Sequence, residues 1–76
     1  MPPNWWQDAK PESMTSYDTL MKECAGNRHI VLDFYSPQCR YCYEFMPEFN
    51  KVYDFMMNKY GNEQIVIFKV NGWEAP

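Results

Sequence analysis

The sequence lacks any apolar run close to the ~20 residues that a membrane-spanning helix needs, and its start, MPPNWWQDAK, lacks the basic and apolar segments of a secretory leader. We therefore expect no membrane span. The missing leader favours the cytosol or an organelle matrix as the location of the protein. The lumen of the endoplasmic reticulum is the alternative if a leader has been removed. The net charge is only −3, which argues against nucleic acid and against an anionic membrane as the main partner.

Cysteine is also scarce. The 76 residues contain three cysteines, an odd number and too few for a secreted disulfide scaffold. A chain of this length has room for one small domain, whose stability is marginal unless something supports it. Aromatic residues, in contrast, make up 18% of the sequence, which predicts more apolar surface than one small core can cover.

The first thirteen residues differ in composition from the rest of the chain. Residues 1–13 hold three of the six prolines and the pair Trp5-Trp6, which predicts an irregular N-terminal arm that packs down through its tryptophans. We expect residues 14–76 to form the domain itself. This domain opens with a short helix at about residues 16–25, capped by Ser13 or Thr15 and ended by Gly26-Asn27.

The remaining pattern is strand, helix, strand. HIVLDFYS (29–36) and QIVIFKV (64–70) are apolar runs typical of strands that are covered on both faces. Between them, residues Arg40–Tyr60 predict a long helix closed by Gly61-Asn62, with a kink at Pro47. The apolar residues of this helix recur at helical spacing: Cys42, Phe45, Met46, Phe49, Val52, Tyr53, Met56 and Tyr60. Two strands joined by such a crossover are parallel, so we expect an α/β fold.

The motif Cys39-Arg40-Tyr41-Cys42 lies where the first strand gives way to the long helix. A cysteine at a helix N-terminus is favoured as a thiolate by the unpaired backbone N–H groups and the helix dipole, and a lowered pKa makes it a nucleophile near neutral pH. Arg40 would add positive charge beside both sulfurs. Cys42, one turn further on, could attack a mixed disulfide formed at Cys39.

Two other interpretations of the motif remain open. The two cysteines could be a structural disulfide or a buried thiol pair without catalytic function. They could also form half of a zinc site with Cys24 and His29. Geometry disfavours zinc, because His29 begins the strand and Cys39 follows its far end, roughly 20 Å away along an extended chain.

The stretch IVLDFYSPQCRYCYEFMPEF resembles the active-site segment of thioredoxins and of protein disulfide isomerase domains. In that family a buried acid stands six residues before the first cysteine, here Asp33, and a helix-kinking proline stands five residues after the second, here Pro47. A lysine on the next strand neighbours the acid, and Lys69 of IVIFKVN fits that place. The resemblance covers about residues 14–72, and FYSP and MPEF are closer to the disulfide isomerase branch.

The resemblance implies a thioredoxin-like fold, present up to the point before the cis-proline strand and the C-terminal hairpin. It also implies thiol–disulfide exchange with protein thiols and disulfides, in which Cys39 attacks, Cys42 resolves and Asp33 moves a proton, its pKa raised by burial. Lys69 either pairs with Asp33 or is solvated at the end of its strand. No metal, nucleotide or other cofactor is expected.

A second function stays open, that of a structural or interaction subunit without catalysis. Gln38 stands where the family usually has tryptophan before the first cysteine, and the strand that would cover one edge of residues 30–35 is absent from the sequence. An exposed apolar strand edge is a template for pairing with another chain. We therefore expect a fragment, half of a split domain, or a subunit whose sheet is completed by another chain or by a swapped copy.

Overall fold

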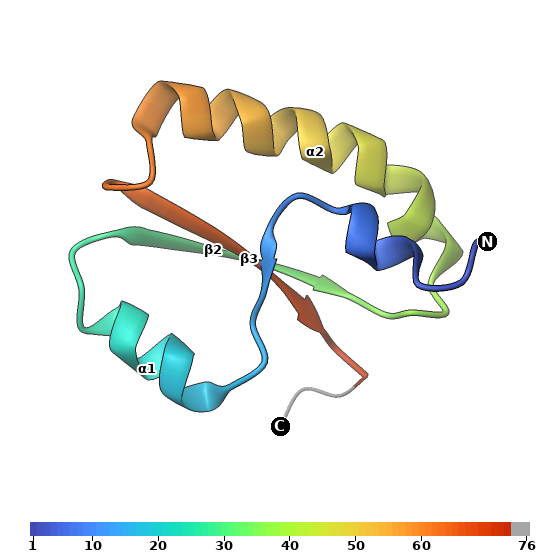
Figure 1. Cartoon of the computed structure of the whole chain (residues 1–76), viewed down its shortest axis with the longest axis horizontal. Helices are drawn as coiled ribbons and strands as arrows, with labels where there is room; N and C mark the ends of the chain where they lie inside the picture. Colours follow the sequence, from blue (N-terminus) through green and yellow to red (C-terminus); the bar gives the residue numbers. More distant parts are fainter. Residues whose placement is uncertain (74–76) are drawn as a thin grey trace.

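Two long parallel strands form the centre of the molecule (Figure 1). The computed structural model describes residues 1–73, in which β2 (His29–Tyr35) and β3 (Ile65–Asn71) pair without a break in register. α2 (Arg40–Tyr60) connects them, as the crossover between two parallel strands. The predicted α/β strand–helix–strand core is confirmed.

The helix α2 has the bounds that its apolar pattern predicted. It ends at Gly61, whose φ of 76° lies in the left-handed region that glycine adopts without strain and whose amide donates to the carbonyl of Met57 over 2.9 Å. Pro47 lies inside the helix. The ribbon of α2 changes direction in its N-terminal part, in agreement with the bend expected near that proline (Figure 1).

The short helix α1 (Tyr17–Cys24) begins one residue later than the sequence indicated. Its N-cap is Ser16, whose Oγ accepts hydrogen bonds from the amides of Asp18 (3.1 Å) and Thr19 (3.4 Å). The prediction of Ser13 or Thr15 as the cap was wrong. The hydroxyl that caps a helix must reach the second or third amide of the first turn, and in this chain Ser16 does so.

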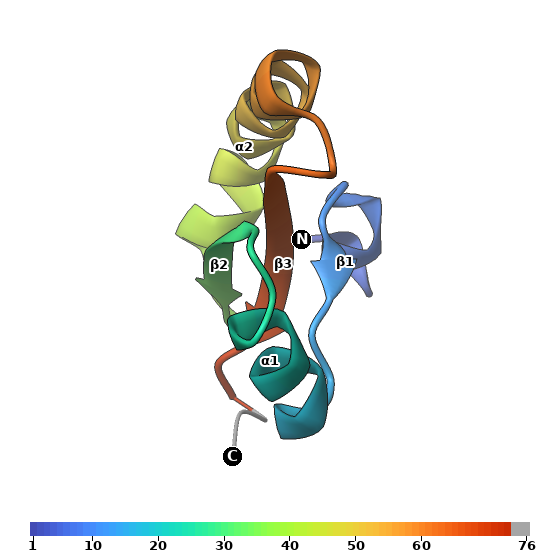
Figure 2. The same cartoon turned by 90° about the vertical axis from the view of Figure 1, so that its left-hand side faces the viewer.

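The N-terminal arm (residues 1–13) is more ordered than the sequence suggested. It contains the 3₁₀ helix η1 (Trp5–Asp8) and the two-residue strand β1 (Glu12–Ser13), which pairs in parallel with β3. The prolines and the Trp5-Trp6 pair of this segment predicted an irregular arm. A two-residue strand carries too little alternation to be recognised in a sequence. The sheet order is β1-β3-β2, with α2 over one face and α1 over the other (Figure 2).

Burial differs between the two long strands. In β3 the apolar side chains Ile65, Ile67, Phe68 and Val70 are buried, as expected for a strand covered on both faces. In β2 most side chains are only half-buried and Phe34 is 60% exposed, so the prediction of two-sided burial was wrong there. The reason is strand order, because β1 pairs with β3 and leaves β2 at the edge of the sheet.

The outer edge of β2 can be assigned residue by residue. The amide of His29 donates to the carbonyl of Gln64 (2.9 Å), and the carbonyl of Tyr35 accepts from the amide of Gly72 (2.7 Å), so the odd-numbered residues of β2 bond to β3. In a parallel strand the alternate residues face the other side. The backbone groups of Ile30, Leu32 and Phe34 therefore face outward, where no strand of residues 1–73 pairs with them.

Apolar side chains also lie exposed on the helices. On α2, members of the predicted apolar face (Phe45, Val52 and Tyr60) are exposed, together with Tyr41 and Phe55. This agrees with the expectation that so aromatic a chain has more apolar surface than its core covers. Within residues 1–73, neither helix combines the length and apolar character that crossing a membrane would require.

Candidate active site

A tight turn carries the chain from β2 into α2. The amide of Cys39 donates to the carbonyl of Ser36 over 3.0 Å, which closes a four-residue turn with Pro37 at its second position. Proline favours that position because its fixed φ matches the turn. The amide of Gln38 donates to the Oγ of Ser36 over 3.4 Å. The turn delivers Cys39 to the N-terminus of α2.

Cys39 is the N-cap residue of α2. Its backbone is extended, with φ −84° and ψ 106°, and its Sγ accepts a hydrogen bond from the amide of Cys42 over 3.1 Å. A cap side chain normally accepts from this third amide of the helix, and sulfur here takes the place of the usual oxygen. All three cysteines of the chain, including Cys24, are free thiols. The predicted position of Cys39 at the helix N-terminus is therefore present in the structure.

The pKa values of the two thiols are shifted in opposite directions. The pKa of Cys39 is lowered, first by the hydrogen bond from the Cys42 thiol and next by the hydrogen bond from the Cys42 amide. The pKa of Cys42 is raised, first by burial, then by donation of its thiol proton to Cys39 and by the nearby negative charges of Cys39 and Asp33. This arrangement makes Cys39 the more readily ionised of the two thiols and keeps the proton on Cys42 up to a higher pH than on Cys39.

Asp33 lies close to this pair. Its half-buried side chain lines a cavity of about 220 Å³ that Cys42 also lines, on the face of the sheet covered by α2. Burial raises the pKa of the Asp33 carboxyl. A carboxyl group with a raised pKa beside a protonated thiol can accept the proton of that thiol as the thiol becomes a nucleophile. Aromatic and apolar side chains provide most of the remaining lining.

Lys69 occupies the predicted place on the sheet but makes different contacts. It is the register partner of Asp33, yet its Nζ donates to the backbone carbonyls of Trp6 (2.7 Å) and Ala9 (2.9 Å). The salt bridges of residues 1–73 do not include one between Lys69 and Asp33. The side chain is 7% exposed, and burial lowers its pKa. Lys69 is thus neither solvated nor paired with Asp33, because its Nζ donates hydrogen bonds to two backbone carbonyls of the N-terminal arm.

Arg40 does not have the role that its position suggested. Its guanidinium is well exposed and forms an ion pair with Glu44, one turn along α2, over 3.2 Å. The lowered pKa of Cys39 arises from groups of Cys42 and Tyr41 instead. The expectation that Arg40 supplies positive charge to both sulfurs was therefore wrong.

The aromatic residues around the turn are the part of the site that the sequence did not predict. Trp5 is 4% exposed, and its Nε1 donates to the carbonyl of Pro37 over 3.0 Å. Its ring packs edge-on against the rings of Trp6, Tyr35 and Tyr43, with centroids 5.7 to 5.9 Å apart. The Trp5-Trp6 pair predicted packing of the arm, but nothing in the sequence indicated that it packs beside the cysteines.

The residues considered for zinc are spread over the molecule. Cys24 is exposed at the end of α1, and His29 is exposed at the start of β2. Across residues 1–73, no three side chains of His, Cys, Asp or Glu come together as a metal site would need. The candidate dithiol site thus consists of Cys39, Cys42 and the nearby Asp33.

Comparison with known proteins agrees with this geometry. A protein-family model described as Thioredoxin matches residues 9–76, which is most of the chain. Comparison with curated proteins and with solved structures found no match.

Proposed function

Because the chain belongs to the thioredoxin family, we propose that it is a thiol–disulfide oxidoreductase that uses Cys39 and Cys42 as its dithiol. The observation that carries the proposal is the position of Cys39 as the cap of α2, where its Sγ accepts the Cys42 amide over 3.1 Å. A hydrogen-bonded thiolate at a helix N-terminus is the nucleophile that such exchange requires. The substrates would be disulfides or thiols of other proteins.

In the first step the Cys39 thiolate attacks one sulfur of a substrate disulfide. The substrate S–S bond breaks, a mixed disulfide forms between Cys39 and the attacked sulfur, and the other substrate sulfur leaves as a thiolate that takes a proton from water. One S–S bond replaces another, so no outside oxidant is needed: the Cys39 sulfur is oxidised to the disulfide level as the leaving substrate sulfur is reduced to a thiolate. The lowered pKa of Cys39 keeps a larger fraction of it in the reactive thiolate form.

In the second step Cys42 releases the substrate. Its thiol gives its proton to the carboxylate of Asp33, and the resulting thiolate attacks the Sγ of Cys39. A disulfide forms between Cys39 and Cys42, while the bound substrate sulfur leaves as a thiolate and takes up the proton that Asp33 accepted. In total the substrate gains two electrons and two protons. The protein supplies both electrons and the Cys42 proton, and water supplies the other proton. A small dithiol such as dithiothreitol returns the protein to its reduced form.

The experiment is reduction of a protein disulfide with dithiothreitol as the final reductant. The parent chain should accelerate the reaction, and Cys39→Ser should abolish the acceleration. Cys42→Ser, incubated with the disulfide substrate before dithiothreitol is added, should instead accumulate a mixed disulfide through Cys39, visible by mass spectrometry as an adduct that dithiothreitol then removes. Cys24→Ser serves as the matched control and should behave as the parent. No acceleration by the folded parent, or an adduct at Cys24 alone, would contradict the proposal.

A specific observation also favours the second candidate, an interaction subunit. The outward edge of β2 is unpaired within residues 1–73, and Phe34 on that strand is 60% exposed. We propose that another chain, or a second copy of this one, completes the sheet at this edge. Pairing at this edge would not by itself prevent catalysis, because the dithiol site lies at the end of β2 and the pairing edge lies along its side.

A further inference from the structure

The N-terminal arm is fastened to the rest of the molecule at three places. The first is β3, where the buried Nζ of Lys69 donates to the carbonyls of Trp6 and Ala9. These two carbonyls flank the end of η1, so one ammonium group holds both the last turn of η1 and the residue that follows it. The ammonium group of a buried lysine needs hydrogen-bond acceptors. Those of Lys69 are carbonyls of the arm, so the group keeps its partners only while the arm stays in place.

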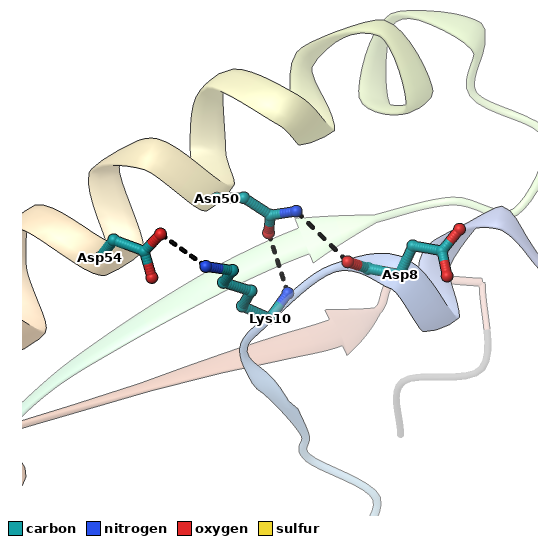
Figure 3. A network of polar contacts seen from close by, with 4 residues as sticks. All are labelled: Asp8, Lys10, Asn50 and Asp54. Carbon is teal, nitrogen blue, oxygen red and sulfur yellow. Dashed lines mark hydrogen bonds and ion pairs between the residues drawn. The ribbon is translucent and has the colours of Figure 1, made fainter.

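The second place is α2, through Asn50 (Figure 3). Its Oδ1 accepts from the amide of Lys10 over 2.8 Å, and its Nδ2 donates to the carbonyl of Asp8 over 3.2 Å. One turn along α2, the carboxylate of Asp54 forms an ion pair with the ammonium of Lys10. The side-chain amide thus bonds to the arm backbone as a neighbouring strand would, with one donor and one acceptor.

The third place is the turn that precedes Cys39. The Nε1 of Trp5 donates to the carbonyl of Pro37, which belongs to the central peptide bond of the Ser36–Cys39 turn. Trp5 is almost fully buried, so water does not readily replace this hydrogen bond. The orientation of the central peptide is what distinguishes one turn type from another. Fixing its carbonyl therefore fixes how the chain enters α2.

We propose that the N-terminal arm is a positioning element of the dithiol site, in which Trp5 holds the Ser36–Cys39 turn and thereby keeps Cys39 at the cap of α2. This inference rests on the proposed function, because a fixed position of Cys39 matters only if Cys39 takes part in thiol–disulfide exchange. Trp5 acts through Pro37, to whose carbonyl its Nε1 donates, and is therefore a positioning residue. If the turn loosens, the Cys39 Sγ no longer meets the Cys42 amide at a fixed distance, and the thiolate loses a stabilising donor.

The test is the pH profile of Cys39 alkylation by iodoacetamide, mapped by mass spectrometry in the parent and in Trp5→Phe. The substitution keeps an aromatic ring and removes the indole donor. We expect the profile of Cys39 to move to higher pH and alkylation near pH 6.5 to slow about threefold to tenfold, the size of one hydrogen bond. A change in stability alone would not move this profile in the folded protein.

Trp73→Phe is the matched control, because it removes an indole donor from an exposed tryptophan that follows β3. Trp73 is 79% exposed, and its backbone amide, which the substitution retains, donates to the Oδ1 of Asn71 over 2.9 Å. This variant should keep the parent profile. Circular dichroism checks that each variant is folded. If Trp5→Phe is unfolded, Asn50→Ala replaces it, because alanine favours the helix and the change releases the arm from α2; the profile should then move in the same direction.

The outcomes separate this inference from the proposed function. A Cys39 profile that moves in Trp5→Phe or Asn50→Ala, and stays unchanged in Trp73→Phe, supports the positioning role. A parent with a reactive Cys39 and an unchanged profile in the folded arm variants overturns the positioning role and leaves the oxidoreductase proposal intact. A parent in which Cys39 titrates like a free thiol overturns both.

Discussion

Cys39 and Cys42 lie one helical turn apart, yet the structure places their thiols in different environments. Cys39 receives two hydrogen bonds from Cys42, which lower its pKa, whereas burial and donation to Cys39 raise the pKa of Cys42. The asymmetry is a consequence of helix geometry, because only the cap residue faces the free amides of the first turn. The order of attack proposed above follows from it.

Asp33 offers a test at this scale through its effect on stability. Because burial raises its pKa in the folded chain, the folded state binds the proton more tightly than the unfolded state does. The resulting stabilisation is complete below the ordinary carboxyl pKa of about 3.9 and is lost as the pH rises through the folded pKa. Asp33→Asn cannot ionise, so at pH 7 it should be at least as stable as the parent.

Denaturant unfolding at neutral and acidic pH measures the difference in free energy between Asp33→Asn and the parent. The advantage of the variant should shrink as the pH falls. Glu12→Gln, which removes an exposed acid on β1, controls for the loss of one negative charge. If the parent instead gained stability over Asp33→Asn between acidic and neutral pH, the carboxylate would have to be a stabilised group.

The same variant tests the proton transfer. Without a carboxylate to accept the Cys42 proton, release of substrate from the mixed disulfide should slow by about 10²-fold, the lower end of what a positioned base contributes. Stopped-flow measurement of substrate release from a preformed mixed disulfide isolates this step. A release rate equal to that of the parent across neutral pH would remove Asp33 from the mechanism.

At the scale of elements, the sequence predicted the ends of α2 correctly but not the N-cap of α1. α2 was predicted with its bounds because a long apolar stripe and Gly61 delimit it. The cap of α1 was not, because Ser13, Thr15 and Ser16 are all residues that can cap a helix, and local sequence does not choose among them. The choice depends on where β1 ends and the chain turns toward α1.

The N-cap at Ser16 leads to a prediction about the stability of α1. Ser16→Ala should lower the free energy of unfolding by about 1 kcal/mol, the usual cost of losing an N-cap, because two amides lose their acceptor. Thr15→Ala, next to it on the exposed surface, should change stability by no more than about 0.5 kcal/mol. Denaturant unfolding of both variants gives the comparison. A larger loss in Thr15→Ala than in Ser16→Ala would place the cap where the sequence first suggested.

The pairing of strands shows a similar limit. The resemblance to thioredoxins implied that Lys69 neighbours Asp33, and the register of β2 and β3 agrees. The sequence did not predict that Lys69 bonds to the arm, because the competing acceptors are two backbone carbonyls some sixty residues away in the chain. Backbone carbonyls leave no trace in side-chain patterns. Contacts of this kind require the tertiary arrangement.

At the scale of the whole molecule, strand order decides what is exposed. β1 pairs along one edge of β3 and β2 pairs along the other. The outer edge of β2 therefore has no neighbouring strand within residues 1–73 and faces solvent. The apolar character of HIVLDFY predicted a strand buried on both faces, and that character would suit β2 if a further strand and its covering elements lay beyond it. The exposed Phe34 is the clearest sign of this mismatch between sequence and surroundings.

We therefore expect the purified chain to associate through β2. The backbone groups of Ile30, Leu32 and Phe34 face outward, with no strand of residues 1–73 to pair with them, and the side chain of Phe34 is exposed. A second copy that pairs at this edge would bond to these groups and cover apolar surface, which lowers the free energy. Static light scattering should give a mass of at least a dimer.

A charged side chain on the edge strand tests where the association occurs. Phe34→Lys should shift the scattering mass toward the monomer, because lysine on a strand edge opposes pairing with another chain, and the side chain it replaces is already exposed. Phe55→Lys is the matched control, since Phe55 is 64% exposed on α2, away from the edge. It should leave the mass of the assembly unchanged. A monomeric parent with slow amide exchange at Ile30, Leu32 and Phe34 would contradict the expectation, because those amides would then be protected within a single chain.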